Sequence, residues 1–301
     1  MKKKRSVFFR RTILVTLLLS LMVALVGCGN GGNSGNNAGN NANKAASDST
    51  EQESSLKGKK IKVATMEEFY FKDVVMAAQK NLAKDGIELE VVTFADNVTP
   101  NTATMEGSVD YNFFEHVPFL DDFNNSKQGG DLVVVGKPIT AAYEGLHSNT
   151  YKSLDDIKDG ARVGIPNDAS NRTMHLKILD KLGLIKLKDN SAETVDLTDI
   201  AENPHKFNFI EMDTPSIVSS LDDLDLGTCS QSSIVKRGID PKTALATYND
   251  PSLGIVLVTK KENADTELTK RVYEAFTSQE VLDMISEKYD NVVEPLFVQD
   301  K

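Results

Sequence analysis

Tryptophan is absent from this 301-residue chain, and only two cysteines occur in it, Cys28 and Cys229. The chain therefore has no disulfide framework to hold it together. Its length is sufficient for two domains with substantial hydrophobic cores, and these must supply the stability. We expect Cys229, which follows a predicted strand, to be a buried and inert thiol.

The sequence motifs of several enzyme classes are also absent. Neither phosphate-binding glycine pattern, GxxxxGK[ST] or GxGxxG, opens a predicted helix, and no GxSxG nucleophile elbow occurs. The four histidines stand singly, without the spacing of a zinc site. We therefore predict a protein that is not an enzyme and that has no cofactor and no metal. The formal net charge of −10 argues against nucleic acid as a partner.

The first 27 residues are organised as a lipoprotein signal peptide. Six Lys and Arg residues precede or flank an apolar run from Ile13 to Val26, which is too short for a typical membrane span. The run ends in Leu25-Val26-Gly27-Cys28, the lipobox pattern of bacterial lipoproteins. We predict cleavage before Cys28 and lipidation of its sulfur, which anchors the protein stably once two or more acyl chains are attached. Loss of the six basic residues takes the formal charge from −10 to −16.

Residues 28–58 are predicted to form a flexible tether. Of the 30 residues from 29 to 58, 18 are Gly, Asn or Ser, so the segment cannot bury enough apolar surface to offset its ordering entropy. Flexible-chain scaling gives it a reach of roughly 30 Å. Such a tether fits a globular body held at the extracytoplasmic face of a cell membrane, and we favour a Gram-positive cell surface.

From residue 59 onward, predicted strands alternate with predicted helices, which is typical of βαβ units around a parallel sheet. We predict an α/β protein with two lobes, the first formed by residues 59–139 and 248–301 and the second by residues 140–247. The predicted strands are 61–65, 87–94, 109–113, 131–135, 162–165, 207–212, 224–228 and 253–259, and the main predicted helices are 71–84, 101–107, 116–125, 171–182, 214–221 and 268–287.

The stretch from Val163 to Gly183 is a candidate binding element. A strand turns through small polar residues into a helix, with Asp168 and Ser170 as N-cap candidates. A helix N-terminus presents free N–H groups and a positive dipole end, which suit a carboxylate or another anion. The alternative is an ordinary strand-to-helix connection.

A second candidate is the aromatic cluster from Asp110 to Phe119, which contains His116 at a predicted strand end. Ligands bind at the carboxyl ends of strands in open parallel sheets. We therefore predict that Phe114, His116 and Tyr143 line an apolar pocket, and that Phe113 belongs to the core. The alternative is that most of these aromatic residues are core.

Taken together, these and other motifs resemble the methionine-type substrate-binding lipoproteins of ABC importers, the NlpA family. The resemblance covers residues 60–297 and implies a two-lobed periplasmic-binding-protein fold that closes on an amino acid and delivers it to a permease. It is carried by Thr99-Pro-Asn101, Asp110-Tyr-Asn-Phe-Phe-Glu-His116, Pro118-Phe-Leu-Asp-Asp-Phe123, Tyr151-Lys-Ser-Leu-Asp155, Ile165-Pro-Asn-Asp-Ala-Ser-Asn171, Ala201-Glu-Asn-Pro204 and Ser220-Leu-Asp-Asp-Leu-Asp225.

The chain departs from the family pattern at the residues that hold the ligand. In the family, an Arg that clamps the ligand carboxylate follows Asn-Asp-Pro-Ser-Asn-Gly-Gly, and aligned from Asn167 this position is Met174 here. The family's Asn-Gly-Asn-Tyr is replaced by residues 230–233, Ser-Gln-Ser-Ser, and Glu115 stands where Gln is common. A thioether cannot replace a bidentate Arg–carboxylate contact. Arg172 replaces that arginine only if residues 171–173 are not helical, and otherwise it is a solvated charge on the first helical turn.

The predicted ligand-binding residues are therefore Phe114, His116, Tyr143, Asn171, Arg172, Met174, Ser230 and Ser232. We predict a monomeric, membrane-anchored solute-binding protein of an ABC importer, with a permease and an ATPase as partners. Its ligand is expected to be methionine or a related amino acid, a dipeptide or a small organic solute. The alternative is a diverged surface lipoprotein with an adhesion or interaction role and no transport ligand.

Overall fold

The computed structural model describes residues 56–67, 69–126 and 130–298. The predicted signal peptide, Cys28 and the predicted tether up to residue 55 lie outside the described residues. Within the described residues, no helix combines the length and the apolar character that crossing a membrane requires. The described residues belong to one compact unit.

The first sheet has six strands in the order β13-β4-β12-β3-β1-β2. β1 is parallel to β2 and β3, whereas β12 is antiparallel to β3 and β4. The prediction of a parallel sheet is thus wrong for part of this sheet, because β4 leaves it for the second sheet and β12 returns in the opposite direction. The strands are β1 (Lys60–Met66), β2 (Glu88–Phe94), β3 (Tyr111–His116), β4 (Leu132–Ala142), β12 (Ile255–Lys260) and β13 (Val293–Pro295).

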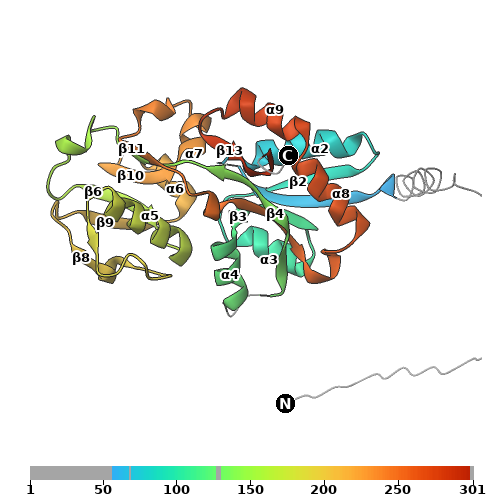
Figure 1. Cartoon of the computed structure of the whole chain (residues 1–301), viewed down its shortest axis with the longest axis horizontal. Helices are drawn as coiled ribbons and strands as arrows, with labels where there is room; N and C mark the ends of the chain where they lie inside the picture. The colour runs from blue at the N-terminus through green and yellow to red at the C-terminus, as the bar shows by residue number, and fades with distance from the viewer. Residues whose placement is uncertain (1–55, 68, 127–129, 299–301) are drawn as a thin grey trace, which may run out of the picture. The chain divides into compact units, whose positions relative to one another are not determined.

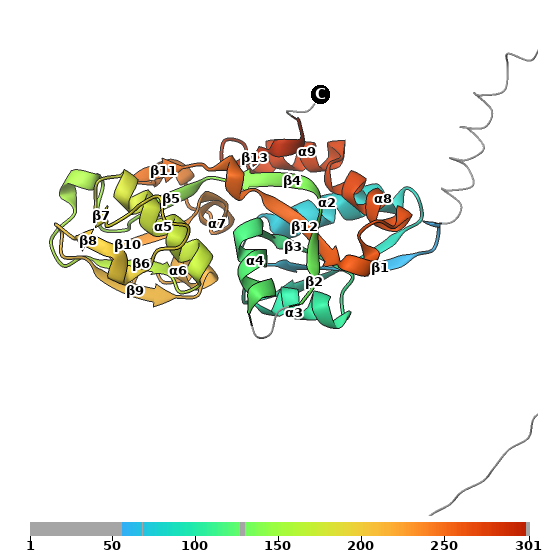
Figure 2. The same ribbon diagram turned by 60° about the horizontal axis from the view of Figure 1, so that its bottom comes forward.

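Helices cover both faces of this sheet, as Figures 1 and 2 show. α2 (Phe71–Ala83), α8 (Glu267–Phe276) and α9 (Gln279–Lys288) pack together on one face, where they bury the largest hydrophobic cluster. α3 (Thr99–Glu106) and α4 (Val117–Asn125) cover the other face. We call this sheet and its helices lobe 1.

The single helix predicted over residues 268–287 is wrong in one respect, because α8 and α9 are separate helices. The Thr277 hydroxyl donates a hydrogen bond to the Tyr273 carbonyl oxygen (3.1 Å). Side chains that bond locally to the backbone compete with the helical ladder, and Thr277 lies at the break.

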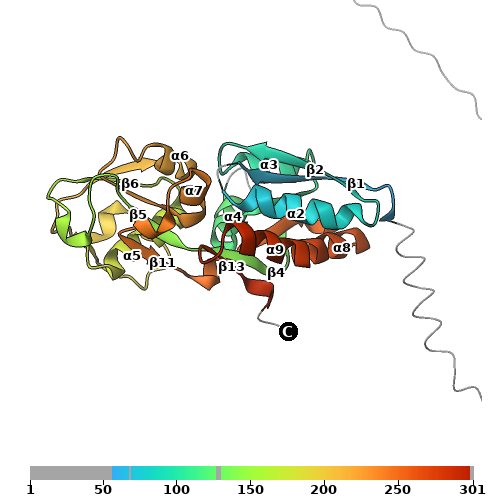
Figure 3. The same ribbon diagram turned by 90° about the horizontal axis from the view of Figure 1, so that it is seen from above.

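The second sheet has five strands in the order β11-β5-β10-β6-β9. With its helices it forms lobe 2, where α5 packs on one face and α6 and α7 on the other, as seen from above in Figure 3. Its elements are β5 (Glu144–His147), β6 (Arg162–Pro166), β9 (Asn208–Met212), β10 (Leu226–Ser230), β11 (Ala246–Tyr248), α5 (Ala169–Lys181), α6 (Thr214–Ser219) and α7 (Gln231–Lys236), beside the small pair β7 (Lys186–Leu187) and β8 (Ile200–Glu202).

Two glycines let α6 and the loop after it approach the second sheet closely. A Cβ at Gly164 would lie 2.5 Å from Leu224, and one at Gly227 would lie 2.5 Å from Leu221. Real Cβ atoms do not come this near another heavy atom. A side chain at either position would force the facing leucine to move.

The chain passes between the two sheets twice. β4 ends at Ala142 and β5 begins at Glu144, so the first crossing is at Tyr143. The second lies between β11 and β12, in residues 249–254. The domain limits drawn from the sequence remain predictions.

Candidate functional site

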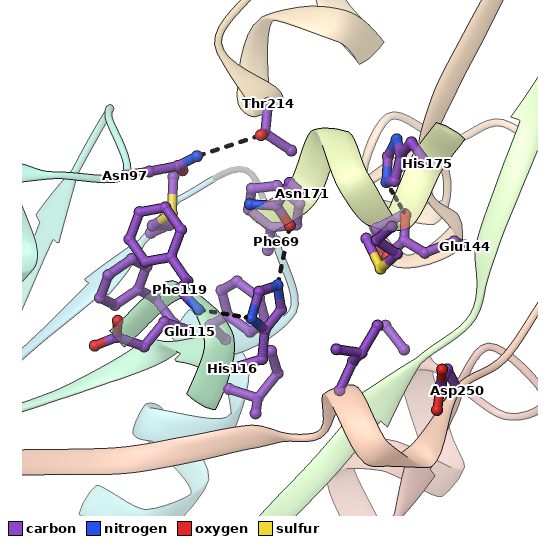
Figure 4. Close-up of a pocket in the computed structure, with 18 of the residues that line it drawn as sticks. Phe69, Asn97, Glu115, His116, Phe119, Glu144, Asn171, His175, Thr214 and Asp250 are labelled. Carbon is purple, nitrogen blue, oxygen red and sulfur yellow. Dashed lines mark hydrogen bonds and ion pairs between the residues drawn. The ribbon is translucent and has the colours of Figure 1, made fainter. Parts of the chain in front are cut away.

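A cavity of about 80 Å³ is lined by side chains from both lobes (Figure 4). One water needs ~10–15 Å³ of such a volume, so the cavity has space for roughly five to eight water-sized groups. This is the size of a small organic molecule. Cavities at the interface of two compact parts are the usual position of small-molecule sites.

Lobe 1 supplies an aromatic wall to the cavity, formed by Phe69, Phe71, Phe114 and Phe119. The rings of Phe69 and Phe71 are stacked with centroids 5.0 Å apart, and those of Phe114 and Phe119 meet edge to face at 5.9 Å. All four side chains are buried in the main core of lobe 1. The wall is therefore held in place by the packing behind it.

His116 links the two lobes at the end of β3. Its Nδ1 accepts a hydrogen bond from the Phe119 backbone N–H (3.2 Å), which caps α4. The ring proton therefore lies on Nε2, which donates to Oδ1 of Asn171 in lobe 2 (3.1 Å). Burial lowers the pKa of His116, which favours the neutral ring.

The N-terminus of α5 is capped by the chain itself. The Asp168 side chain accepts from the Asn171 backbone N–H (2.9 Å), so its predicted N-cap role is confirmed. The Asn171 side-chain amide donates to both Asp168 carboxylate oxygens, at 3.0 and 3.1 Å. A carboxylate is thus already in contact with the helix end that was predicted to bind an anion.

Arg172 is held away from the cavity. α5 begins at Ala169, so residues 171–173 are helical, which is the condition under which Arg172 was not expected to replace the family arginine. Its guanidinium Nη1 donates to Glu211 Oε1 (2.8 Å) and to the Asn167 carbonyl oxygen (3.0 Å). Arg172 is therefore ion-paired rather than solvated, whereas Met174 lines the cavity.

Of the remaining predicted residues, only Ser230 lines the cavity. Ser230 lines the cavity at the end of β10, where its hydroxyl oxygen caps α7. Ser232 is fully buried, with its hydroxyl 2.9 Å from that of Ser230. Tyr143 is outside the set of cavity-lining residues, and its carbonyl oxygen accepts from the Gln231 backbone N–H (2.8 Å). The ligand-binding roles of all these residues remain predictions.

Sequence reasoning missed several polar residues of the cavity, among them Glu144, His175 and Asp250. Glu144 follows Tyr143 at the crossing between the sheets, where a four-residue strand has too few positions to show which side chains face inward. His175 follows Met174 and is 1% exposed. Its Nδ1 lies 2.5 Å from the Thr228 hydroxyl, and its Nε2 lies 3.5 Å from Glu144 Oε2.

A second direct bond between the lobes lies beside the cavity. The Asn97 side-chain amide donates to the Thr214 hydroxyl oxygen at 3.3 Å, and both residues line the cavity (Figure 4). The Thr214 hydroxyl in turn donates to Asp168 Oδ2 (3.3 Å). The lobes are therefore joined on two sides of the cavity by hydrogen bonds that an opening motion would break.

Glu115 also lines the cavity and is only 3% exposed. Its Oε2 accepts from the Asn101 amide (2.7 Å), whereas its Oε1 and the Oδ1 of Asn112 have no donor. Burial raises the pKa of Glu115 to about 8, so the carboxyl is protonated at neutral pH. A proton on Oε1 makes this oxygen a hydrogen-bond donor, so that it no longer needs one.

Cys229 is a free thiol that is 1% exposed, as predicted. Burial raises the pKa of this thiol well above its usual value, which suppresses the reactive thiolate. Over residues 56–67, 69–126 and 130–298, no group of three or more His, Cys, Asp or Glu side chains is arranged to hold a metal ion.

The chain is similar to known proteins along most of its length. The D-methionine-binding lipoprotein MetQ of Salmonella typhi is 36% identical over 223 residues, which cover 72% of this chain and 81% of that protein. The crystal structure of the methionine-binding protein MetQ matches with a TM-score of 0.74 and 32% identity, over 78% of this chain and 97% of that one. The substrate-binding protein of a methionine transporter from Streptococcus pneumoniae matches with a TM-score of 0.73 and 29% identity, over 79% and 95%.

These structural matches confirm the predicted two-lobed periplasmic-binding-protein fold. The sequence profile described as NlpA lipoprotein matches residues 61–297. A match over this share of the chain also confirms the resemblance drawn from the sequence motifs. The chain belongs to the NlpA lipoprotein family.

Proposed function

We propose that this protein is the lipid-anchored, solute-binding component of an ABC importer. Its ligand is methionine or a related amino acid, a dipeptide or a small organic solute, which it delivers to a permease driven by an ATPase. The observation that carries the proposal is the cavity between the lobes, walled by four aromatic rings on one side and by polar side chains on the other. The relatives named as methionine-binding proteins support the same kind of ligand.

The anchor is Cys28, which follows the lipobox at the end of the predicted signal peptide. Lipidation there places the body on the extracytoplasmic face of a cell membrane, and the Gly-, Asn- and Ser-rich segment after it provides reach toward a permease. Mass spectrometry of the protein from its native membrane tests this part. A diacylglyceryl group on an N-terminal Cys28 supports it, and an unmodified thiol contradicts it.

Binding is proposed to shift an equilibrium between open and closed arrangements of the lobes. The closed arrangement is held by His116–Asn171 and Asn97–Thr214. The Lys236 ammonium of α7 adds hydrogen bonds to the carbonyl oxygens of Glu67 (2.7 Å) and Phe69 (2.8 Å) in lobe 1. A ligand that contacts both walls of the cavity favours this arrangement, which is the form proposed to engage the permease.

Isothermal titration tests the proposal directly. The full-length protein is purified in detergent, freed of carried-over ligand by unfolding and refolding, and titrated with methionine, its dipeptides, a panel of amino acids and small organic amines. Saturable binding of at least one of these at micromolar or lower Kd supports a transport ligand. Native mass spectrometry of the protein before unfolding then identifies any molecule that co-purifies. Silence in both experiments contradicts the proposal.

One observation favours a second candidate function, a diverged surface lipoprotein with an interaction role and no transport ligand. The cavity has Met174 and Ser230 where the family pattern places ligand-holding Arg and Asn residues, and Arg172 is paired elsewhere. Under this alternative no small solute changes the distance between the lobes. A small-angle scattering titration that shows ligand-dependent closure decides against it.

A further inference from the structure

Among the described residues that line the cavity, none is a lysine or an arginine. An amino acid brings a carboxylate into such a site, and a desolvated carboxylate needs a cation or several N–H donors. The charge of the cavity therefore bears on which ligand it accepts. This inference rests on the proposed function and concerns the chemical class of its ligand.

The arginine and the two histidines that would lie nearest to a bound carboxylate already have partners. The Arg172 guanidinium is paired with Glu211 through Nη1, and its buried Nε has no partner among the described residues, but Arg172 does not line the cavity. Both ring nitrogens of His116 are used, one by Phe119 and the other by Asn171. The His175 ring lies between Thr228 and Glu144.

The remaining anion site is the N-terminus of α5, and it is also taken. Asp168 accepts the backbone N–H of Asn171 there, and the Asn171 side chain is turned onto the same carboxylate. A ligand carboxylate would have to compete with the Asp168 carboxylate for these donors. At short range the two carboxylates would also repel each other.

Negative groups, in contrast, reach the cavity from two directions. Glu144 faces it from the crossing between the sheets, with 18% of its side chain exposed, and Asp250 faces it from the second crossing (Figure 4). Glu144 has one weak partner, His175 at 3.5 Å, which leaves capacity for a stronger donor. The aromatic wall lies across the cavity from them, and aromatic faces attract cations as well as apolar groups.

A groove next to the cavity also has a predominantly negative lining. A groove of about 680 Å³ shares Met174, Tyr248, Asp250 and Leu253 with the cavity. Its lining carries five carboxylates, which are Asp121, Asp122, Asp180, Glu193 and Asp250.

Only two ammonium groups, Lys177 and Lys181, belong to that lining among the described residues. Lys177 donates to the Ala192 carbonyl oxygen (2.7 Å), and the Lys181 ammonium lies 4.5 Å from the centroid of the Tyr248 ring. Burial, and then repulsion by Asp168, raises the pKa of Asp122 at the edge of this groove. A negative electrostatic potential along this groove attracts positively charged ligands.

We propose that the cavity binds a small organic cation, a protonated amine that lacks a free carboxylate, in preference to a zwitterionic amino acid. Glu144, assisted by Asp250, pairs with the ammonium group, and the phenylalanine wall holds the apolar body. Met174, which occupies the position of the family arginine, leaves the cavity without the positive charge that a carboxylate requires.

A series of four methionine-related probes separates charge from shape. Methylthiopropylamine is a cation, methioninamide is a cation when its amine is protonated, methionine is a zwitterion and N-acetylmethionine is an anion. The full-length protein, stripped of carried-over ligand, is titrated with each by calorimetry at a pH where both amines are protonated. The expected order of affinity is amine, then amide, then methionine, with no binding of the anion, and about tenfold or more between the amine and methionine.

Two variants test the residues named. Glu144→Gln keeps the shape of the side chain and is expected to lower amine affinity about tenfold or more and to flatten its dependence on salt. Glu202→Gln is the matched control, because it removes an exposed carboxylate of lobe 2 whose partner is Lys186. Met174→Arg is expected to reverse the preference, so that methionine binds more tightly than the amine. Thermal unfolding of each variant confirms that it is folded.

The outcomes are distinguishable. Amine preference that Glu144→Gln removes and Glu202→Gln keeps supports the inference. Methionine or N-acetylmethionine binding as tightly as the amine overturns the inference and leaves the proposed function standing. Absence of binding by all four probes and by the wider solute panel overturns both. An amine preference unchanged in Glu144→Gln overturns the role of Glu144.

Discussion

Lobe 1 pairs several buried hydroxyls with one another and leaves one atom each of Asn112, Glu115 and Ser278 without a partner among the described residues, whereas in lobe 2 unpartnered atoms of His147 and Gln231 lie together beside one glycine. In lobe 1 the Tyr70 and Thr140 hydroxyls are 2.7 Å apart, and those of Tyr111 and Thr269 are 2.8 Å apart. In lobe 2 both side-chain amide atoms of Gln231, Nε2 of His147 and the hydroxyl of Ser233 have no partner in the described part of the chain. An unpartnered buried polar group costs about 1–3 kcal/mol, so lobe 2 holds unused hydrogen-bonding capacity.

That capacity lies directly behind the cavity. A Cβ at Gly145 would be 2.5 Å from His147 Nε2 and 2.7 Å from Gln231 Nε2, and the chain neighbours Glu144 and Ser230 line the cavity. Lobe 1 thus provides a closely packed platform with an aromatic wall, while lobe 2 carries the polar residues in which this chain departs from the family pattern. We therefore expect lobe 2 to set ligand preference and lobe 1 to contribute most of the stability.

The largest expected effect concerns the core of lobe 1. Phe113 is fully buried, with its ring centroid 5.2 Å from that of Phe276 and 6.1 Å from that of Phe71. Phe113→Ala is expected to lower the free energy of unfolding by about 3–5 kcal/mol in urea titrations. Phe209→Ala in lobe 2 is the matched control, and it should lose less because this ring is only partly buried. Equal losses would contradict the view that lobe 1 dominates stability.

The second prediction uses the buried carboxyl of lobe 1. Glu115 has its pKa raised from 4.5 to about 8, so between these pH values the folded state holds a proton that the unfolded state has released. Stability is then complete below about pH 4.5 and falls as pH rises to about 8, by a total on the order of 5 kcal/mol. Glu115→Gln should remove this alkaline loss in urea titrations at pH 5, 7 and 9.

Glu106→Gln, at an exposed position of α3, should leave that loss unchanged. A Glu115→Gln variant with the same alkaline loss as the wild type would show that Glu115 is not its source.

The third prediction concerns His147 in lobe 2, which makes stability change with pH in the opposite direction. Burial lowers the pKa of His147 from 6.5 to about 4, so between these values the unfolded state binds a proton that the folded state does not. Stability is complete above pH 6.5 and falls as pH decreases to about 4, by on the order of 3 kcal/mol. His147→Gln should reduce the loss between pH 7 and pH 4.5 by most of this amount. Parallel curves for the variant and the wild type would contradict it.

The smallest expected effect compares one N-cap in each lobe. Asp168 caps α5 in lobe 2, and Thr266 caps α8 in lobe 1 by accepting from the Thr269 N–H (3.1 Å). Replacement of either by Ala should lower the free energy of unfolding by about 1 kcal/mol. Only Asp168→Ala should also change ligand affinity in calorimetry, because it frees Asn171 at the cavity. Equal effects of both variants on affinity would contradict the division of roles between the lobes.

Local pattern was sufficient to predict most of the long elements. α2 and α5 carry apolar residues at helical spacing, and β1 and β2 are seven-residue strands rich in apolar and β-branched residues. All four were therefore predicted close to their observed bounds. β5, β11, β13 and α7 were missed, because three to six residues are too few to show a period.

The site could be predicted in part. Phe114, His116, Asn171, Met174 and Ser230 line the cavity, as the family resemblance indicated, and their contribution to binding remains to be measured. Glu144, His175 and Asp250 could not be placed by local pattern, because a strand end, a buried helix face and a loop meet at the cavity only after the lobes have folded.

By itself the sequence determined most of the long strands and helices, the two-lobed family fold and the stretch around Asp168 as a candidate binding element. These features depend on short-range periodicity and on motifs that are continuous along the chain. Only the tertiary structure decided the charge of the cavity. Arg172 pairs with Glu211, 39 residues away, and His116 bonds to Asn171, 55 residues away. Such pairings depend on which surfaces meet in space, and they leave a cavity lined by the carboxylates of Glu144 and Asp250 and by no lysine or arginine of the described residues.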